Sequence, residues 1–144
     1  MKTKTNQKGF SLVELTIVVV ILGILATLAV PRFMTSVEKT KASEGLSYLH
    51  QIELQQDRFM AMKGRYATSL GELRDITGES VTKPKFFNTR RFYSSNWQKR
   101  WNTKIIRNGP SSGFGNYRIA WGHKGFTSRS TIPSELLPDG YQVD

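Results

Sequence analysis

The chain has 144 residues, of which 21 are Lys or Arg and 11 are Asp or Glu, so its formal net charge is +10. This length allows one ordinary domain with a modest core, and the absence of cysteine excludes disulfides, cysteine-based zinc sites and thiol nucleophiles. The basic excess suits anionic partners such as nucleic acid, lipid headgroups or acidic proteins, without choosing among them.

Residues 1–9 form a short basic segment, and a long apolar run follows it. This run, from Phe10 to Val30, has 21 residues, mostly Leu, Ile, Val and Ala, and Glu14 is its only charged residue. Because about 20 apolar residues suffice for one helix to cross a bilayer, the sequence predicts a membrane helix over residues 10–31. An ordinary secretory signal would be cleaved after the run, where the sequence fits such a site poorly.

Glu14 needs an explanation, since a charged residue inside a membrane segment costs up to about 2.5–3.5 kcal/mol at mid-bilayer. One interpretation is an interfacial glutamate that keeps its charge among the headgroups. The other is that Glu14 awaits a positive partner from another chain, and an amino terminus newly made at Phe10 would be such a cation. The residues alone leave both interpretations open.

The sequence GFSLVEL at residues 9–15, between a Lys-rich leader and an apolar helix, resembles the prepilin signature of type IV pilins and type II secretion pseudopilins. The match is close over residues 1–33 and fades afterwards. The resemblance implies that a membrane prepilin peptidase cuts between Gly9 and Phe10 and then N-methylates Phe10. It also implies that Glu14 pairs with the terminal amine of a neighbouring subunit in a helical filament.

Gly23 and Pro31 interrupt the predicted helix. A mid-helix glycine costs about 1 kcal/mol relative to alanine. Proline costs about 3 kcal/mol, because it removes a backbone donor and crowds the preceding turn. Either the segment between them kinks where the helix leaves the membrane, or it melts locally when subunits pack, as the resemblance implies. Both residues are therefore candidates for a role in assembly.

Apolar side chains recur at helical spacing over residues 32–63, which predicts an amphipathic continuation of the helix that packs against a sheet. The predicted apolar face comprises Ala42, Leu46, Leu49, Ile52, Phe59 and Met60. The charged residues, Glu38 among them, are expected to lie mostly away from this face. Lys63 followed by Gly64 predicts the end of the helix.

Residues 64–144 are expected to form a small globular head. Ser69 with Glu72 three residues later predicts a capping box for a short helix that reaches about Ile76. Alternating or β-prone residues predict short strands over Arg90–Ser94, Thr103–Arg107 and Tyr117–Trp121, after which the chain turns towards Phe126–Ile132. The expected fold class is α+β and pilin-like: a long N-terminal helix packed on an antiparallel sheet of three or four strands.

From Ser80 to Ser134 the chain has 11 basic residues and no acidic one, interleaved with aromatic residues. Cations that neutralise phosphates and rings that stack on bases are the ingredients of single-strand binding, so this block is a candidate DNA-binding region. The alternative is that the rings form the core of the sheet and the cations its solvated face. The candidate residues for binding DNA or another anion are Lys83, Lys85, Arg90, Arg91, Trp97, Lys99, Arg100 and Trp101.

Few features of the chain indicate catalysis or metal binding. Residues 109–113 match the nucleophile elbow G-x-S-x-G, but that motif needs a helix after the serine, and a strand pattern follows here. His50 and His123 have no metal-ligand spacing, and the acidic residues near the carboxyl terminus are sparse. We therefore expect no catalytic residue, no cofactor and no metal.

The resemblance implies a structural subunit of a type IV pilus or type II secretion pseudopilus. The expected location is the bacterial inner membrane, crossed once with the head in the periplasm or outside, and then the filament. The expected partners are the prepilin peptidase, membrane lipid, other pilin subunits and the inner-membrane assembly platform. A minor pilin that takes up DNA through its head is the alternative, and a single-pass membrane enzyme is a third hypothesis that the missing catalytic residues disfavour.

Overall fold

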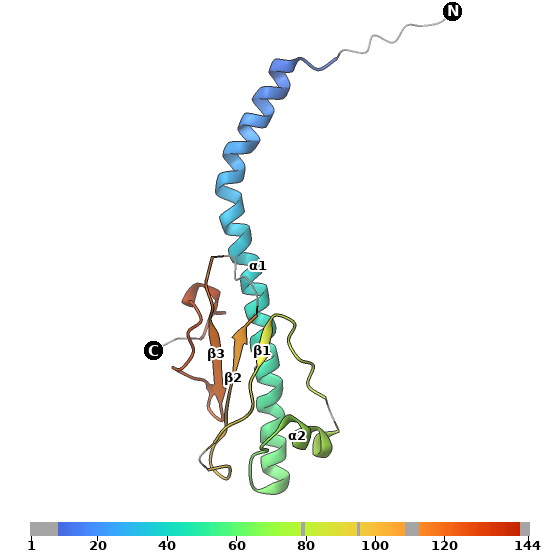
Figure 1. Cartoon of the computed structure of the whole chain (residues 1–144), viewed down its shortest axis with the longest axis vertical. Helices are drawn as coiled ribbons and strands as arrows, with labels where there is room; N and C mark the ends of the chain where they lie inside the picture. The colour runs from blue at the N-terminus through green and yellow to red at the C-terminus, as the bar shows by residue number, and fades with distance from the viewer. Residues whose placement is uncertain (1–8, 79, 95, 109–112, 142–144) are drawn as a thin grey trace, which may run out of the picture. The chain divides into compact units, whose positions relative to one another are not determined.

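A computed structural model describes residues 9–78, 80–94, 96–108 and 113–141. The leader before Gly9 and most of the G-x-S-x-G motif lie outside these residues. The chain divides into two compact units, Met1–Met34 and Thr35–Asp144, and each is described by itself. One helix, α1 (Leu12–Lys63), contributes residues to both units (Figure 1).

In the first unit, the described residues form an exposed apolar helix. Every residue from Gly9 to Met34 is exposed, large apolar side chains included. Within the described part of the chain, α1 is the one helix long and apolar enough to cross a membrane. Exposing apolar surface to water costs roughly 25 cal/mol per Å². We therefore expect this surface to be buried against lipid or protein. Pro31 lies inside α1 and does not end it.

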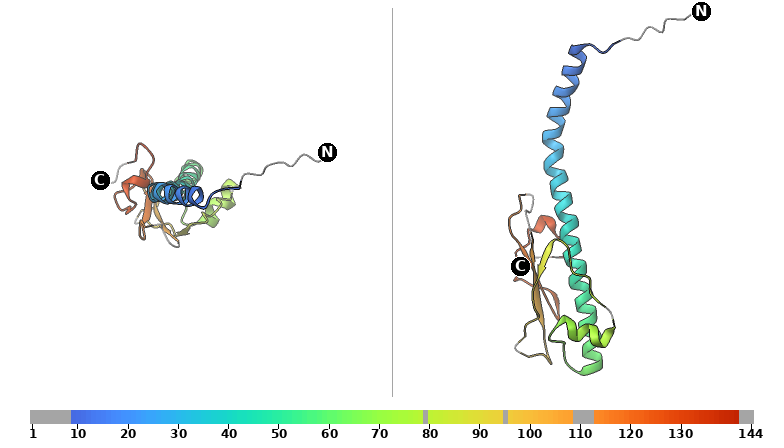
Figure 2. Two further views of the ribbon diagram at one scale, coloured as in Figure 1. Left: turned by 90° about the horizontal axis from the view of Figure 1, so that it is seen from above. Right: turned by 45° about the vertical axis from the view of Figure 1, so that its right-hand side comes forward.

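In the second unit, α1 packs one face against a sheet, as its apolar periodicity predicts (Figure 2). The buried residues that confirm this face are Ala42, Leu46, Leu49, Ile52 and Phe59. Met60 is only half-buried. Gly45 lies on the same face, and a Cβ atom there would come within 2.8 Å of side-chain atoms of Ile105 and Phe87. Glycine therefore allows the helix and the sheet to approach closely.

The sheet is antiparallel, with four strands in the order β1-β2-β3-β4. The strands are β1 (Phe87–Thr89), β2 (Asn102–Arg107), β3 (Arg118–Gly122) and β4 (Gly125–Phe126). Ile105 in the middle of β2 pairs with Thr89 on one side and with Ile119 on the other. The predicted α+β fold, with a long helix on a small antiparallel sheet, is confirmed.

The strand predicted over Arg90–Ser94 is wrong, because β1 lies three residues earlier. Only an isolated bridge between Tyr93 and Asn102 remains of it. Four steps along the chain separate Thr89 from Tyr93, whereas three steps separate their partners on β2. The extra residue interrupts the ladder, as in a β-bulge. The last strand is also shorter than the predicted stretch, since β4 has two residues.

The short helix α2 (Leu70–Thr77) follows α1 and begins at the predicted cap. The Ser69 hydroxyl accepts a hydrogen bond from the Glu72 backbone N–H at 3.2 Å. The Glu72 carboxylate does not return to Ser69. It accepts from the Thr68 backbone N–H at 2.8 Å and forms an ion pair with Arg65. Glu72 thus links the start of α2 to the end of the preceding turn.

The ionisation of Glu72 predicts acid sensitivity in this region. The hydrogen bond from Arg65 is the main reason that the pKa of Glu72 falls from 4.5 to about 2. A carboxyl with a lowered folded pKa contributes stability above its unfolded pKa, and this contribution is lost as the pH falls through the folded pKa. From about pH 5 to about pH 2, we expect the melting temperature measured by circular dichroism to fall more steeply than in Glu72→Gln. Equal slopes would contradict this assignment.

Candidate functional site

The peptide bond between Gly9 and Phe10 lies ahead of the first helix, where both residues are exposed. Phe10 is 86% exposed, and α1 begins only at Leu12. A Cβ atom at Gly9 would meet nothing within 4 Å. No described contact of this chain therefore requires glycine at this position, so a requirement for it would have to come from another molecule that recognises this bond.

Glu14 caps the helix that it belongs to. Its Oε2 atom accepts a hydrogen bond from the Ser11 backbone N–H at 3.0 Å, and the Ser11 hydroxyl accepts from the Val13 N–H at 3.3 Å. Ser11 and Glu14 are three residues apart, which is the spacing of a capping box. The sequence carried this signal, but the prediction for Glu14 missed it. A carboxylate is also favourable here because the N-terminus of a helix carries partial positive charge.

Capping uses one of the two carboxylate oxygens of Glu14. Among the described residues, Oε1 has no hydrogen-bond or ion-pair partner. The threonine hydroxyls of the apolar segment have hydrogen-bond acceptors within their own helix. Thr16 and Thr27 donate to backbone carbonyl groups of α1 at 2.9 and 2.7 Å. Glu14 is thus the single charged residue between Phe10 and Val30, and it can still accept a cation from outside the chain.

Gly23 shares with Gly9 the absence of any packing constraint. A Cβ atom at Gly23 would meet nothing within 4 Å. Gly23 and Pro31 both lie within the continuous helix α1, so the structure describes neither as a break. Local melting between them stays a prediction about the packed state.

The head contains a buried charge cluster that the sequence did not predict. The Glu38 carboxylate accepts hydrogen bonds from Arg107 Nε at 2.5 Å, from the Tyr117 hydroxyl at 3.0 Å and from Lys41 Nζ at 3.3 Å. Glu38 is 0% exposed, so its predicted place on the polar face is wrong. The reason is that Arg107, on the inward face of β2, supplies the compensating charge.

The ionisation of this cluster follows from its contacts. Burial by itself raises the pKa of Glu38, but the hydrogen bonds from Arg107 and Tyr117 outweigh it and hold the pKa below its ordinary value. Burial and the neighbouring carboxylate raise the pKa of Tyr117. Glu38 therefore stays charged in the folded protein, in an ion pair removed from water.

The aromatic residues of the basic block are mostly core. Phe87, Phe92 and Trp101 are 4%, 7% and 0% exposed. Trp101 therefore cannot stack on a base, and its place in the candidate anion-binding set is corrected on this ground. Trp97 is half-buried. This distribution matches the alternative in which the rings build the core and the cations form the solvated face.

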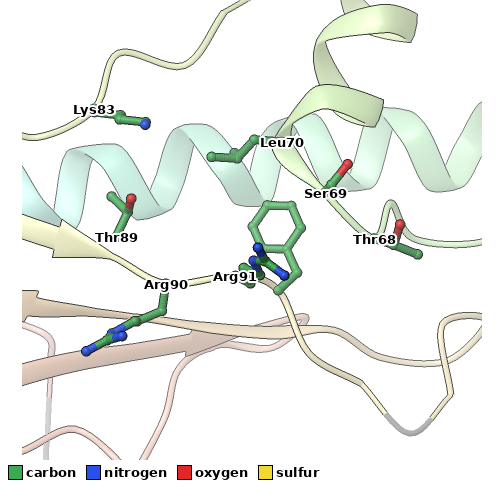
Figure 3. Close-up of a pocket in the computed structure, with 8 residues that line it drawn as sticks. Thr68, Ser69, Leu70, Lys83, Thr89, Arg90 and Arg91 are labelled. Carbon is green, nitrogen blue, oxygen red and sulfur yellow. The ribbon is translucent and has the colours of Figure 1, made fainter.

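Five of the six candidate cations of the block gather at two places on the head. Lys83, Arg90 and Arg91 line a groove of about 460 Å³ beside the start of α2. Figure 3 shows Lys83 and Arg91 on two sides of the groove, with Arg90 pointing away from Lys83 and Leu70. The second group, Lys99, Arg100 and Lys124, lines another depression together with His123, near the start of β2 and the end of β3. Lys85 belongs to neither and lies 5.7 Å from the ring centre of Phe86.

Comparison with known proteins shows that the N-terminal part of the chain is similar to type II secretion core proteins and to type IV pilins. Residues 4–30 match the family model described as the prokaryotic N-terminal methylation motif. The chain is 35% identical over 80 residues to the type II secretion system core protein G of Dickeya chrysanthemi, which covers 56% of this chain and 52% of that protein. It is 34% identical over 82 residues to the core protein G of Aeromonas hydrophila, with 57% of each chain covered.

A type IV pilin is similar as well. The chain is 39% identical over 68 residues to the type IV major pilin protein PilA of Myxococcus xanthus, with 47% of this chain and 31% of that protein covered. The chain spans about half the length of the core G proteins that it matches. The resemblance to type IV pilins and type II secretion pseudopilins, stated above on residues 9–15, is confirmed.

Proposed function

We propose that this chain is a non-catalytic structural subunit of a type II secretion pseudopilus or type IV pilus. The observation that carries the proposal is the apolar run from Phe10 to Val30, which is exposed throughout and holds one charged residue, Glu14. Such a surface can exchange lipid for neighbouring helices of the same kind. Relatives that are named as secretion core proteins and major pilins support the proposal.

In this proposal, residues 1–9 are a leader, residues 10–31 a transmembrane and filament-core helix, residues 32–63 its amphipathic continuation and residues 64–144 the head. Before assembly the chain sits in the bacterial inner membrane with the head in the periplasm or outside. Its partners are membrane lipid, the prepilin peptidase, other pilin subunits and the inner-membrane assembly platform. The apolar helix α1 and the methylation motif support the membrane segment and the leader in this proposal.

Glu14 is proposed to set the register between subunits. The peptidase would cut after Gly9, and the new amine of Phe10 would meet the Glu14 carboxylate of a neighbouring copy. The oxygen that capping leaves unused is available for this contact. An uncompensated carboxylate among packed apolar helices is costly, so only a stacking that brings an amine to each Glu14 would be stable. Gly23 and Pro31 would allow the helix to loosen as it packs.

The processing step can be tested by mass spectrometry of the mature amino terminus. We expect a chain that begins at N-methylated Phe10. Gly9→Val should retain its leader, although nothing within 4 Å of Gly9 would obstruct a side chain in the folded protein. Lys8→Gln, which keeps the glycine, should be cut normally. A native protein with its leader attached, or with an unmethylated Phe10, would contradict the proposal.

A further inference from the structure

The groove beside α2 is a basic surface without an internal counter-charge. Lys83 and Arg91 are exposed, and no ion pair joins either of them to another described residue. The hydroxyls of Thr68 and Ser69 lie on the same groove. The nearby Glu72 carboxylate is already neutralised by Arg65. The groove is therefore suited to carboxylates from another molecule.

The last described segment of the chain has the opposite charge. Residues 130–141 contain Glu135 and Asp139 and no basic residue, and both carboxylates are exposed. Leu136, which is 1% exposed, fixes the segment on the head, and the Tyr141 hydroxyl lies 2.5 Å from His50 Nε2. These two contacts hold the segment in a fixed position on the head, so its two exposed carboxylates form an acidic surface. Asp139 shares a shallow depression with Lys39 of α1, and no ion pair joins the two.

The two surfaces lie on opposite sides of the head. In Figure 1, α2 lies on one side of the head. The red carboxy-terminal segment, with its short helix η1 (Ser134–Leu136), lies on the other side. The right-hand view of Figure 2 shows the same separation. Complementary patches on opposite sides of one molecule make a heterologous contact, which continues from copy to copy and builds an open helical polymer when its rotation does not close a ring.

We propose that the basic groove of one head receives the acidic carboxy-terminal segment of the next copy, with Lys83 and Arg91 facing Glu135 and Asp139. The inference rests on the proposed filament function and names its head-to-head contact. Removing the leader lowers the formal charge of each chain from +10 to +7. Stacked copies would therefore repel unless acidic surfaces meet basic ones, and complementary charge also fixes their register.

A nucleic acid fits this groove less well than an acidic protein surface. Single-strand binding combines cations with rings on which bases stack. The aromatic residue on the groove is Phe92, which is 7% exposed and cannot offer its face to a base. The groove thus presents cations and hydroxyls, which match carboxylates at a protein surface.

Cross-linking tests the contact directly, because the native chain has no cysteine. Full-length chains that carry both Arg91→Cys and Glu135→Cys should yield a ladder of dimers, trimers and longer species when assembled filaments are treated with a short bismaleimide. Chains that carry Lys99→Cys with Glu135→Cys should not, since Lys99 lies outside the groove. Filaments that form but give no ladder from the first pair would overturn the contact while the proposed function stands.

Charge reversal provides the second test. Lys83→Glu combined with Arg91→Glu should lower the yield of filaments about tenfold or more, since it sets like charges against each other. Adding Glu135→Lys and Asp139→Lys to the same chain should restore assembly. Lys99→Glu with Lys124→Glu makes an equal charge change elsewhere and should have little effect. Normal assembly of the groove variant would overturn the inference, whereas failure of the native chain to assemble would overturn the proposed function itself.

Discussion

Replacing Glu38 by alanine is expected to destabilise the head by about 3–5 kcal/mol, because it leaves the buried guanidinium of Arg107 without its counter-ion. The side chains of Glu38 and Arg107 are 0% and 2% exposed, so water cannot take the place of the carboxylate. The Tyr117 hydroxyl would lose its acceptor as well. The measurement is denaturant unfolding of the full chain in detergent micelles, followed by circular dichroism.

Three further variants separate charge from packing at this cluster. Glu38→Gln keeps the shape but removes the charge, and should lie between alanine and the native residue. Glu38→Met with Arg107→Met removes both charges and should recover most of the loss, since buried ion pairs can be replaced by apolar residues at little cost. Asp75→Asn changes an exposed acid and should stay within about 0.5 kcal/mol. A loss below about 1 kcal/mol for Glu38→Ala would contradict the expectation.

Filament assembly should be abolished in Glu14→Gln, although the helix forms normally. The glutamine oxygen can still accept the hydrogen bond from the Ser11 N–H, so the cap survives while the charge is lost. Assembly should fail because the Phe10 amine of the neighbouring copy would then be packed against the apolar segment without an anion. Electron microscopy of sheared filaments measures the result, and helix content by circular dichroism shows that the cap is intact.

Ser11→Ala is the matched control for Glu14→Gln. It removes the serine hydroxyl from the cap, which costs about 1 kcal/mol, and keeps the carboxylate. We expect filaments in near-native amount from this variant. If Ser11→Ala abolished assembly and Glu14→Gln did not, the role of residue 14 would be helix capping, and the proposed pairing between subunits would be wrong.

Sequence patterns correctly predicted the features of the fold that depend on residues close to one another along the chain. The helical spacing of Leu46, Leu49 and Ile52 identified the buried face of α1. The glycine after Lys63 marked the end of the helix, where Gly64 has φ 69° and its N–H donates to the Met60 carbonyl at 2.9 Å. Both features depend on residues within one or two turns, so the sequence reveals them.

Features that depend on distant partners could not be predicted in this way. Glu38 and Arg107 are 69 residues apart, and nothing near Glu38 indicates that a cation will reach it from the sheet. Likewise, the position of β1 depends on its pairing with β2, whose ladder ends at Thr89 before the extra residue. The cap formed by Glu14 differs, because its signal was local and a membrane interpretation of the glutamate obscured it.

The position of Glu38 has a mechanical consequence. The second unit begins at Thr35, and Glu38 is the first residue of that unit to be buried. Tension applied to α1 ahead of Thr35 would therefore reach the Glu38–Arg107 ion pair near the beginning of the contact between helix and sheet, just after the partly buried Val37. Rupture of this ion pair would therefore be an early step when such a load pulls the helix away from the sheet.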